Sequence, residues 1–237
     1  MNRGVATIVA HALFIMATLC TAVQSSEIAR QLEQCHRMDR DHTRDCSEEL
    51  ESRILSKPAS QAAHRGTLLT IRTRAHVVTF KDRPKAETRT IVHTYLGLLH
   101  DLGYHVVFRR FWEGDGFVLV SDLSSKRFPM SAVPHASPKA QRVVSVSASE
   151  AYNPNEIVIW RVTPKRLTQE FQYAPHEYAL YKFLAWEGED IIRLEKFTRS
   201  EQNTCPNSQF MTVREVLKHG QGKWRLSGET PAQVTCQ

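Results

Sequence analysis

A succession of short segments with alternating apolar and polar residues between residues 66 and 226 constrains the fold most. Turn-forming groups such as Glu113-Gly114-Asp115-Gly116 and Asn153-Pro154-Asn155 separate many of them. Such spacing predicts a mainly β protein with antiparallel strands. The expected strands are 67–72, 75–81, 88–95, 104–112, 117–121, 141–147, 156–162, 167–173, 180–186, 190–197, 211–218 and 222–226. Residues 90–102 could instead form a helix, since Ile91, Tyr95 and Leu98 would share one helical face.

The first 25 residues resemble a secretory signal in their charge pattern. Arg3 precedes an uncharged stretch that reaches Ser26, and Val23 and Ser25 suit a cleavage site before Ser26. A retained signal anchor is the alternative, because about 20 apolar residues can span a bilayer. The domain boundaries expected are a signal at 1–25, a helical segment at 26–57, a linker at 58–65 and a β-rich domain at 66–237.

Export determines how the cysteines are interpreted. Cleavage removes Cys20 and leaves four, which in an oxidising compartment indicates two disulfides. Closeness along the sequence favours the pairs Cys35 with Cys46 and Cys205 with Cys236, although all three possible connectivities are open. No Asn-x-Ser/Thr glycosylation signal occurs, which favours a periplasmic location, with general secretion as the other option.

Residues 27–57 have apolar positions at helical spacing and end at Pro58. On one straight helix Cys35 and Cys46 would lie about 16 Å apart, too far for a disulfide. Their pairing therefore predicts a helical hairpin that reverses at residues 39–43, with Asp41 or Thr43 capping the second helix. Zinc bound by Cys35, His36, His42 and Cys46 is the alternative, and the disulfide is favoured because exported thiols oxidise.

Three patterns resemble the blades of secreted β-propeller proteins of the WD-repeat and TolB-like kind. They are the sequence from Pro134 to Ser147, the strand Ile157-Val158-Ile159-Trp160, and the strand pair around Trp186. The likeness covers about residues 104–197, and it departs from the family at Lys139-Ala140 and Arg161. It implies a partial or small propeller-like domain, with a β-sandwich or barrel as alternatives. The Cys35–Cys46 spacing after a signal also resembles the N-terminal module of LprI-type lysozyme inhibitors.

One set of motifs resembles an enzyme. Arg72 or Arg74, then Ser145-Val146-Ser147, then Glu187-Gly188-Glu189 resemble the Arg, Ser-Thr-Ser and Glu-x-Glu motifs of exported ADP-ribosyltransferases. Val146 departs from that pattern, and a hairpin turn explains the last motif equally well. Nucleotide-binding and serine-hydrolase motifs are absent from the sequence. We therefore predict no catalysis, no cofactor and no metal.

Residues 104–112 combine aromatic and basic side chains and are the expected binding surface. Strand alternation places Arg110 and Trp112 on one face and Arg109 on the other. Arginines beside aromatic rings can anchor a protein partner, while a buried strand with arginines at its rim is the structural alternative.

The net charge of +6 and the pI near 9.2 suit an anionic envelope polymer or a protein, and export argues against nucleic acid. The sequence thus predicts an exported macromolecule-binding protein without stable membrane insertion after cleavage. A lysozyme inhibitor is the alternative, for which Glu48, Glu49 and Glu51 would supply the acidic patch.

Overall fold

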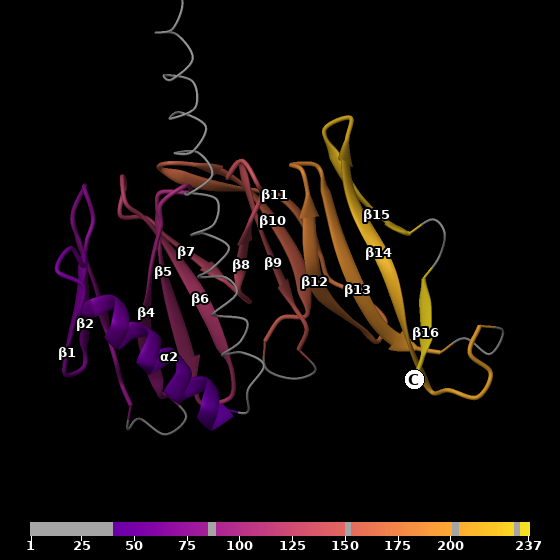
Figure 1. Ribbon diagram of the computed structural model, residues 1–237, viewed down its shortest axis with the longest axis horizontal. Coiled ribbons are helices and arrows are strands. Elements are labelled where there is room, and N and C mark those ends of the chain that lie inside the picture. The colour runs from indigo at the N-terminus through magenta and orange to yellow at the C-terminus, as the bar shows by residue number, and fades with distance from the viewer. Residues whose placement is uncertain (1–39, 85–88, 150–152, 201–203, 230–232) are drawn as a thin grey trace, which may run out of the picture.

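A computed structural model describes residues 40–84, 89–149, 153–200, 204–229 and 233–237, with side chains from residue 45 onward. The protein is mainly β, and its strands form four antiparallel sheets in chain order, as the sequence predicts (Figure 1). The first sheet contains β1 (Ala62–Arg65), β2 (Leu68–Arg72) and β3 (Val77–Lys81). The second contains β4 (Ile91–Leu99), β5 (Tyr104–Phe111), β6 (Asp115–Ser121) and β7 (Arg127–Met130).

The two remaining sheets repeat this plan. The third contains β8 (Pro134–Ala136), β9 (Arg142–Ser147), β10 (Glu156–Thr163) and β11 (Arg166–Tyr173). The fourth contains β12 (Ala179–Glu187), β13 (Ile191–Arg199), β14 (Phe210–Gly220) and β15 (Lys223–Gly228), and β16 (Val234–Cys236) returns to pair with β14. Each sheet is thus built from consecutive strands joined by turns.

The sheets stand side by side in a row, with the first and last at opposite ends (Figure 1). Apolar side chains fill the space between each pair of neighbours. Leu69 and Ile71 of the first sheet pack with Val107 of the second, Phe108 of the second packs with Val143 of the third, and Ile159 of the third packs with Leu194 of the fourth. The inner sheets are therefore buried on both faces.

The second and third sheets share a repeat length. They span residues 91–130 and 134–173, and each is a four-stranded meander of about 40 residues. That length and strand order match what the propeller resemblance implies. The row in Figure 1 is open, without a closed barrel, and membership of the propeller family stays a prediction.

The helix differs from the expected hairpin. Helix α2 runs without interruption over Arg40–Leu55, so residues 41 and 43 lie inside the helix, and the prediction that one of them caps it is wrong. Cys35 and the first half of the hairpin lie outside the described residues. Helix α2 lies across the β4 edge of the second sheet (Figure 1), where it contacts β4 and covers an edge that would otherwise be exposed.

Two further segments differ in detail from the sequence analysis. Strand β1 lies inside the range expected as a linker, and residues 91–99 form a strand and not the alternative helix. No helix in the described part of the chain is long and apolar enough to span a bilayer.

The disulfide between Cys205 and Cys236 is confirmed, with α carbons 5.6 Å apart. It joins the loop before β14 to β16, which pairs with β14. Cys46 is also disulfide-bonded. Its predicted partner, Cys35, lies outside the described residues.

We expect none of Cys35, Cys46, Cys205 and Cys236 to react with a thiol reagent in the native protein, because both predicted bridges would be formed. Peptide mapping without reduction should recover a Cys35–Cys46 and a Cys205–Cys236 peptide. Labelling of Cys35 in native protein would refute the first pairing.

Candidate functional site

The strand expected to carry the binding surface is mostly core. Strand β5 lies between β4 and β6, and its first five residues are buried. Tyr104 and Phe108 pack toward the third sheet, whereas Val107 packs toward the first. The alternation derived from the sequence is thus present, but both faces meet a neighbouring sheet. This part of the strand matches the structural alternative.

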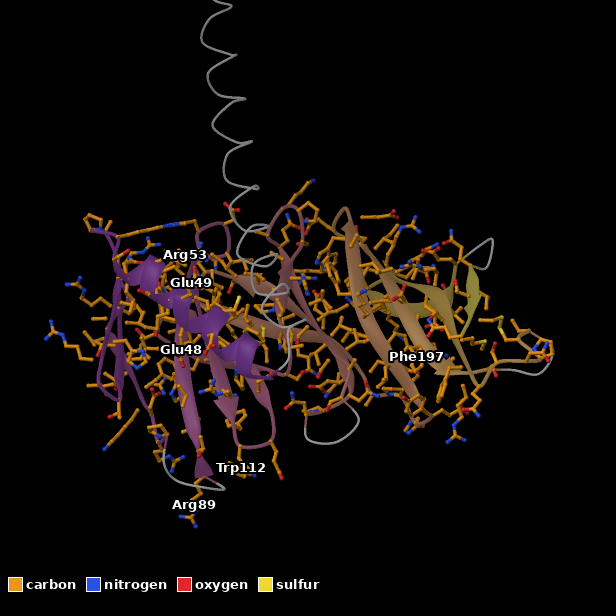
Figure 2. The ribbon with its side chains drawn as sticks, turned by 60° about the horizontal axis from the view of Figure 1, so that its bottom comes forward. Glu48, Glu49, Arg53, Arg89, Trp112 and Phe197 are labelled. Carbon is orange, nitrogen blue, oxygen red and sulfur yellow. A yellow bond between two sulfur atoms is a disulfide. The ribbon has the colours of Figure 1, made fainter. Side chains whose placement is uncertain are left out.

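The structure separates the three predicted binding residues. Arg109 and Arg110 are half-buried on opposite faces of β5, and Trp112 lies just beyond its end. Figure 2 shows Trp112 at the tip of the second sheet, where its side chain is 56% exposed. The other tryptophans, Trp160, Trp186 and Trp224, pack against the cores between sheets. Trp112 differs from these three, because it is exposed and does not pack in a core between sheets.

Arg109 and Trp112 line one groove, of about 610 Å³, whereas Arg110 does not line it. The groove lies between the turn after β5, the end of β7 and the loop before β10. Its apolar lining includes Phe111, Pro129, Met130 and Pro154. Among the residues that the structure describes, its charged lining consists of three carboxylates, Glu113, Asp115 and Glu156, and the guanidinium of Arg109. The groove is therefore acidic on a protein whose net charge is positive.

Arg109 forms part of the wall of this groove. Its guanidinium carbon lies 5.2 Å from the centre of the Phe111 ring, and its Nε is buried without a hydrogen-bond partner among the described residues. Burial lowers the pKa of Arg109. A β carbon at Gly116 would lie 3.0 Å from the Met130 carbonyl oxygen and within 4.0 Å of this guanidinium, so glycine is needed for this close packing.

Two of the three carboxylates are held in place. Glu156 accepts hydrogen bonds from Ser131 Oγ at 2.9 Å and from Gln172 Nε2 at 2.7 Å. The Oδ1 atom of Asp115 lies 3.4 Å from the donor Asn153 Nδ2. Glu113 is exposed beside Trp112. Two carboxylates of the groove are thus hydrogen-bonded, and the third is exposed.

A smaller pocket of about 320 Å³ adjoins the groove and shares Ser131 and Asn153 with it. His135 and Phe183 line this pocket, and their rings are stacked with centres 3.9 Å apart. A ligand larger than one side chain could therefore extend from the groove toward the fourth sheet.

The motifs that resemble a transferase are not brought together. Arg72 ends β2 of the first sheet and Arg74 lies in the turn that follows it. Ser145 and Ser147 belong to the third sheet, and the second sheet stands between (Figure 1). The Glu189 carboxylate accepts hydrogen bonds from Ser137 Oγ and from the Lys139 backbone N–H, both at 2.6 Å. Glu187 pairs with Arg193 at 2.5 Å. Both carboxylates thus hold local turns and strands.

Two chains of buried polar groups link the first sheet to the second, and sequence analysis missed both. In one, His64 Nδ1 lies 2.9 Å from Glu51 Oε2, and His93 Nδ1 lies 2.8 Å from Asp82 Oδ1. His64 Nε2 is 3.2 Å from Asp82 Oδ2, within ion-pair distance but not aligned as a hydrogen bond. The second Glu51 oxygen accepts the Tyr95 backbone N–H at 2.6 Å. This chain therefore fastens helix α2 and both sheets together.

The second chain runs from Tyr95 to Arg74. The Nδ1 atom of His105 lies 2.9 Å from the Tyr95 hydroxyl, and its Nε2 atom lies 3.3 Å from Asp122 Oδ1. The other oxygen of Asp122, Oδ2, accepts a hydrogen bond from Arg74 Nε at 2.5 Å. Burial lowers the pKa of His105 and of His93, although the carboxylates Asp122 and Asp82 oppose the effect. Burial would raise the pKa of Asp122, but hydrogen bonds from Arg74 and His105 outweigh it and lower that pKa. Because His105 is fully buried, this chain offers no ring nitrogen to a substrate.

The described side chains contain no group of three or more histidine, cysteine and acidic residues arranged to hold a metal ion. Of the four zinc ligands considered, Cys46 is disulfide-bonded. A cysteine in a disulfide has no thiolate with which to bind zinc. The side chains of the other three lie outside the described residues.

No family model, curated protein or solved structure matches the chain significantly.

Proposed function

We propose that the protein is an exported, non-catalytic module that binds another protein through the groove beside Trp112. The exposure of Trp112 carries this proposal. A large aromatic side chain left in water forgoes the free energy that burial would provide. Tryptophan is also the residue type most enriched among residues that dominate binding energy. An exposed Trp at the mouth of a groove is therefore a natural anchor for a partner.

The charge of the groove selects between the two partner classes that the sequence suggests. An anionic polymer would meet three carboxylates and one half-buried guanidinium, so this site does not suit it. A lysine or arginine of a partner would lie over the Trp112 ring in a cation–π contact and reach Glu113 at the same time. We therefore assign the groove to a protein segment that carries a basic side chain.

An experiment in the native cell tests this assignment. A photo-crosslinking amino acid replaces Trp112, and a control chain carries it at Lys218, which is exposed on β14 of the fourth sheet and lines neither the groove nor the pocket beside it. We expect a cross-linked protein at position 112 that is absent from the control. The cross-linked peptide should contain a lysine or arginine beside the attachment point.

Purified partner then gives the quantitative result. We expect Trp112→Ala to weaken binding at least about thirtyfold, the loss that corresponds to a 2 kcal/mol hot spot. Glu113→Gln should weaken it less, and the melting temperature should change little in both, because both side chains are exposed. Unaltered affinity in the Trp112→Ala variant would refute the groove as the binding site.

The acidic groove also favours a lysozyme inhibitor as the second candidate, since lysozymes are often basic. The acidic patch expected on the helix is smaller than the sequence suggests, because Glu48 and Glu49 are exposed but Glu51 is buried. Addition of the exported protein to a basic lysozyme should slow lysis if this candidate holds. Inhibition that Glu113→Gln removes would assign it to the groove, and undiminished lysis would exclude it for that enzyme.

A further inference from the structure

The first sheet presents cations without exposed anions. Between residues 57 and 83 the chain has six lysines and arginines and a single acidic residue, Asp82. Asp82 is buried between His64 and His93, so it adds no negative charge to the surface. The six basic residues, all exposed, are Lys57, Arg65, Arg72, Arg74, Lys81 and Arg83. Arg74 pairs with Asp122, and the other five have no carboxylate partner among the described residues.

Strand alternation divides this sheet into two different faces. Leu69, Ile71, Val78 and Phe80 point inward to the core shared with the second sheet. The outer face consists of the alternate residues, among which Arg65, Arg72 and Lys81 are charged. We call this surface the outer face of the first sheet. It lies at the end of the row (Figure 1), and nothing in the described chain packs on it.

Two large aliphatic side chains stand among these cations. Val77 is 61% exposed and Leu68 is 42% exposed, and they account for two of the five large apolar residues exposed in the described chain. Cross-strand pairing places each beside a cation, because Leu68 faces Lys81 and Arg72 faces Val77. Both side chains lie on the outer face of the sheet, so an apolar layer in contact with that face would bury them.

We propose that the outer face of the first sheet docks peripherally on a bilayer rich in anionic lipid. Each lysine or arginine near such a surface strengthens binding through attraction to the anionic lipid head groups. Leu68 and Val77 add burial of apolar surface in the boundary between head groups and acyl chains. Cations attract any polyanion, but a hydrated soluble polymer offers no apolar layer to these aliphatic residues. The combination therefore favours a lipid surface over an anionic polymer.

Vesicle sedimentation with the exported protein, purified as the cell releases it and with its N-terminus sequenced, tests this proposal. The probes are vesicles of phosphatidylcholine alone and vesicles with about 30% phosphatidylglycerol. We expect binding to the anionic vesicles only, and loss of most of it between about 0.05 and 0.5 M salt, where screening shortens the range of surface charge.

Two variants separate the contributions. Arg72→Glu with Lys81→Glu should lower the partition coefficient at least about tenfold. The matched control is Lys218→Glu with Arg225→Glu, an exposed cross-strand pair on the fourth sheet with the same change in charge, and it should lower binding much less. Leu68→Ser with Val77→Thr should weaken vesicle binding several-fold and leave binding to soluble polyphosphate unchanged.

Three outcomes would overturn the proposal. They are equal binding to neutral vesicles, equal losses in the charge variant and its control, and vesicle binding that the aliphatic variant does not weaken. The last outcome, together with tight binding to polyphosphate, would assign the face to an anionic polymer. Circular dichroism of each variant checks that the fold is kept. None of these measurements depends on the groove at Trp112.

Discussion

We expect Asp82→Ala to lower the free energy of unfolding by about 3 kcal/mol or more. Asp82 Oδ1 accepts hydrogen bonds from the backbone N–H of His93 at 2.9 Å and from its ring at 2.8 Å. Its other oxygen faces His64. The alanine variant leaves several of these buried groups without a partner, and each such loss costs about 1 to 3 kcal/mol. Urea unfolding at neutral pH measures the difference.

The neighbouring residue supplies the control. Lys81 is exposed on the same strand, so Lys81→Ala should change stability by less than about 0.5 kcal/mol. A cost for Asp82→Ala no larger than that of Lys81→Ala would show that the chain from Glu51 to His93 does not hold the first sheet in place.

The second large effect is a loss of stability in mild acid. Burial lowers the pKa of His93 and of His105 below the ordinary value of 6.5. The folded state therefore keeps both rings neutral at a pH where the unfolded chain has already bound the protons. Their contribution is fully present above about pH 6.5 and is lost as the pH falls from there toward the folded pKa. Over that range, each ring that stays neutral in the folded state lowers the free energy of unfolding by up to about 1.4 kcal/mol per pH unit.

Urea unfolding at several pH values between about 7.5 and 5 would show this slope. We expect His105→Gln to be less stable at neutral pH, because it disturbs the contacts with Tyr95 and Asp122, but to have a shallower slope. His76, which is exposed, provides the control, and His76→Gln should keep the wild-type slope. Equal slopes in all three proteins would contradict the assignment of neutral, buried rings.

The strands that the sequence predicts are those in sheet interiors or in long hairpins. Strands β5, β9, β10 and β14 have clear alternation or apolar runs, since each meets neighbours on both edges or packs on a core. The four that sequence analysis missed, β1, β7, β8 and β16, are short and lie at sheet edges. Pro129 in β7 and Pro134 in β8 are tolerated there because an edge strand needs hydrogen bonds on one side only.

Two of the residues that line the groove were singled out from the sequence, and their role in binding stays a prediction. Arg109 and Trp112 do line the same groove, but Arg110 does not, because alternation along β5 turns it to the opposite face. The carboxylates that give the groove its charge come from two separate segments, the turn with Glu113 and Asp115 and the strand with Glu156, so no local pattern could have joined all three. Glu113 and Asp115 were seen only as turn residues.

The buried histidine chains could not have been found from one sequence. His64, Asp82 and His93 are far enough apart along the chain that only sheet packing brings them together. The prediction that Asp41 or Thr43 caps a helix was wrong for a related reason. The polar residues near position 41 resemble a turn when read locally, yet helix α2 continues through them and gains its stability from Leu50, Ile54 and Leu55 packed against the sheets.

The arrangement of consecutive strands has a consequence for how the chain acquires its structure. Each of the first three sheets is complete as soon as its own segment has been synthesised, so the row can grow from the N-terminus without waiting for distant residues. The fourth sheet is different, because β16 pairs with β14 although β15 lies between them in the chain, and the disulfide joins Cys205 to Cys236. The edge formed by β16 can close only after residue 236 has been synthesised. Cys205 has no disulfide partner until then, so this bond forms only after the strands of all four sheets have been made.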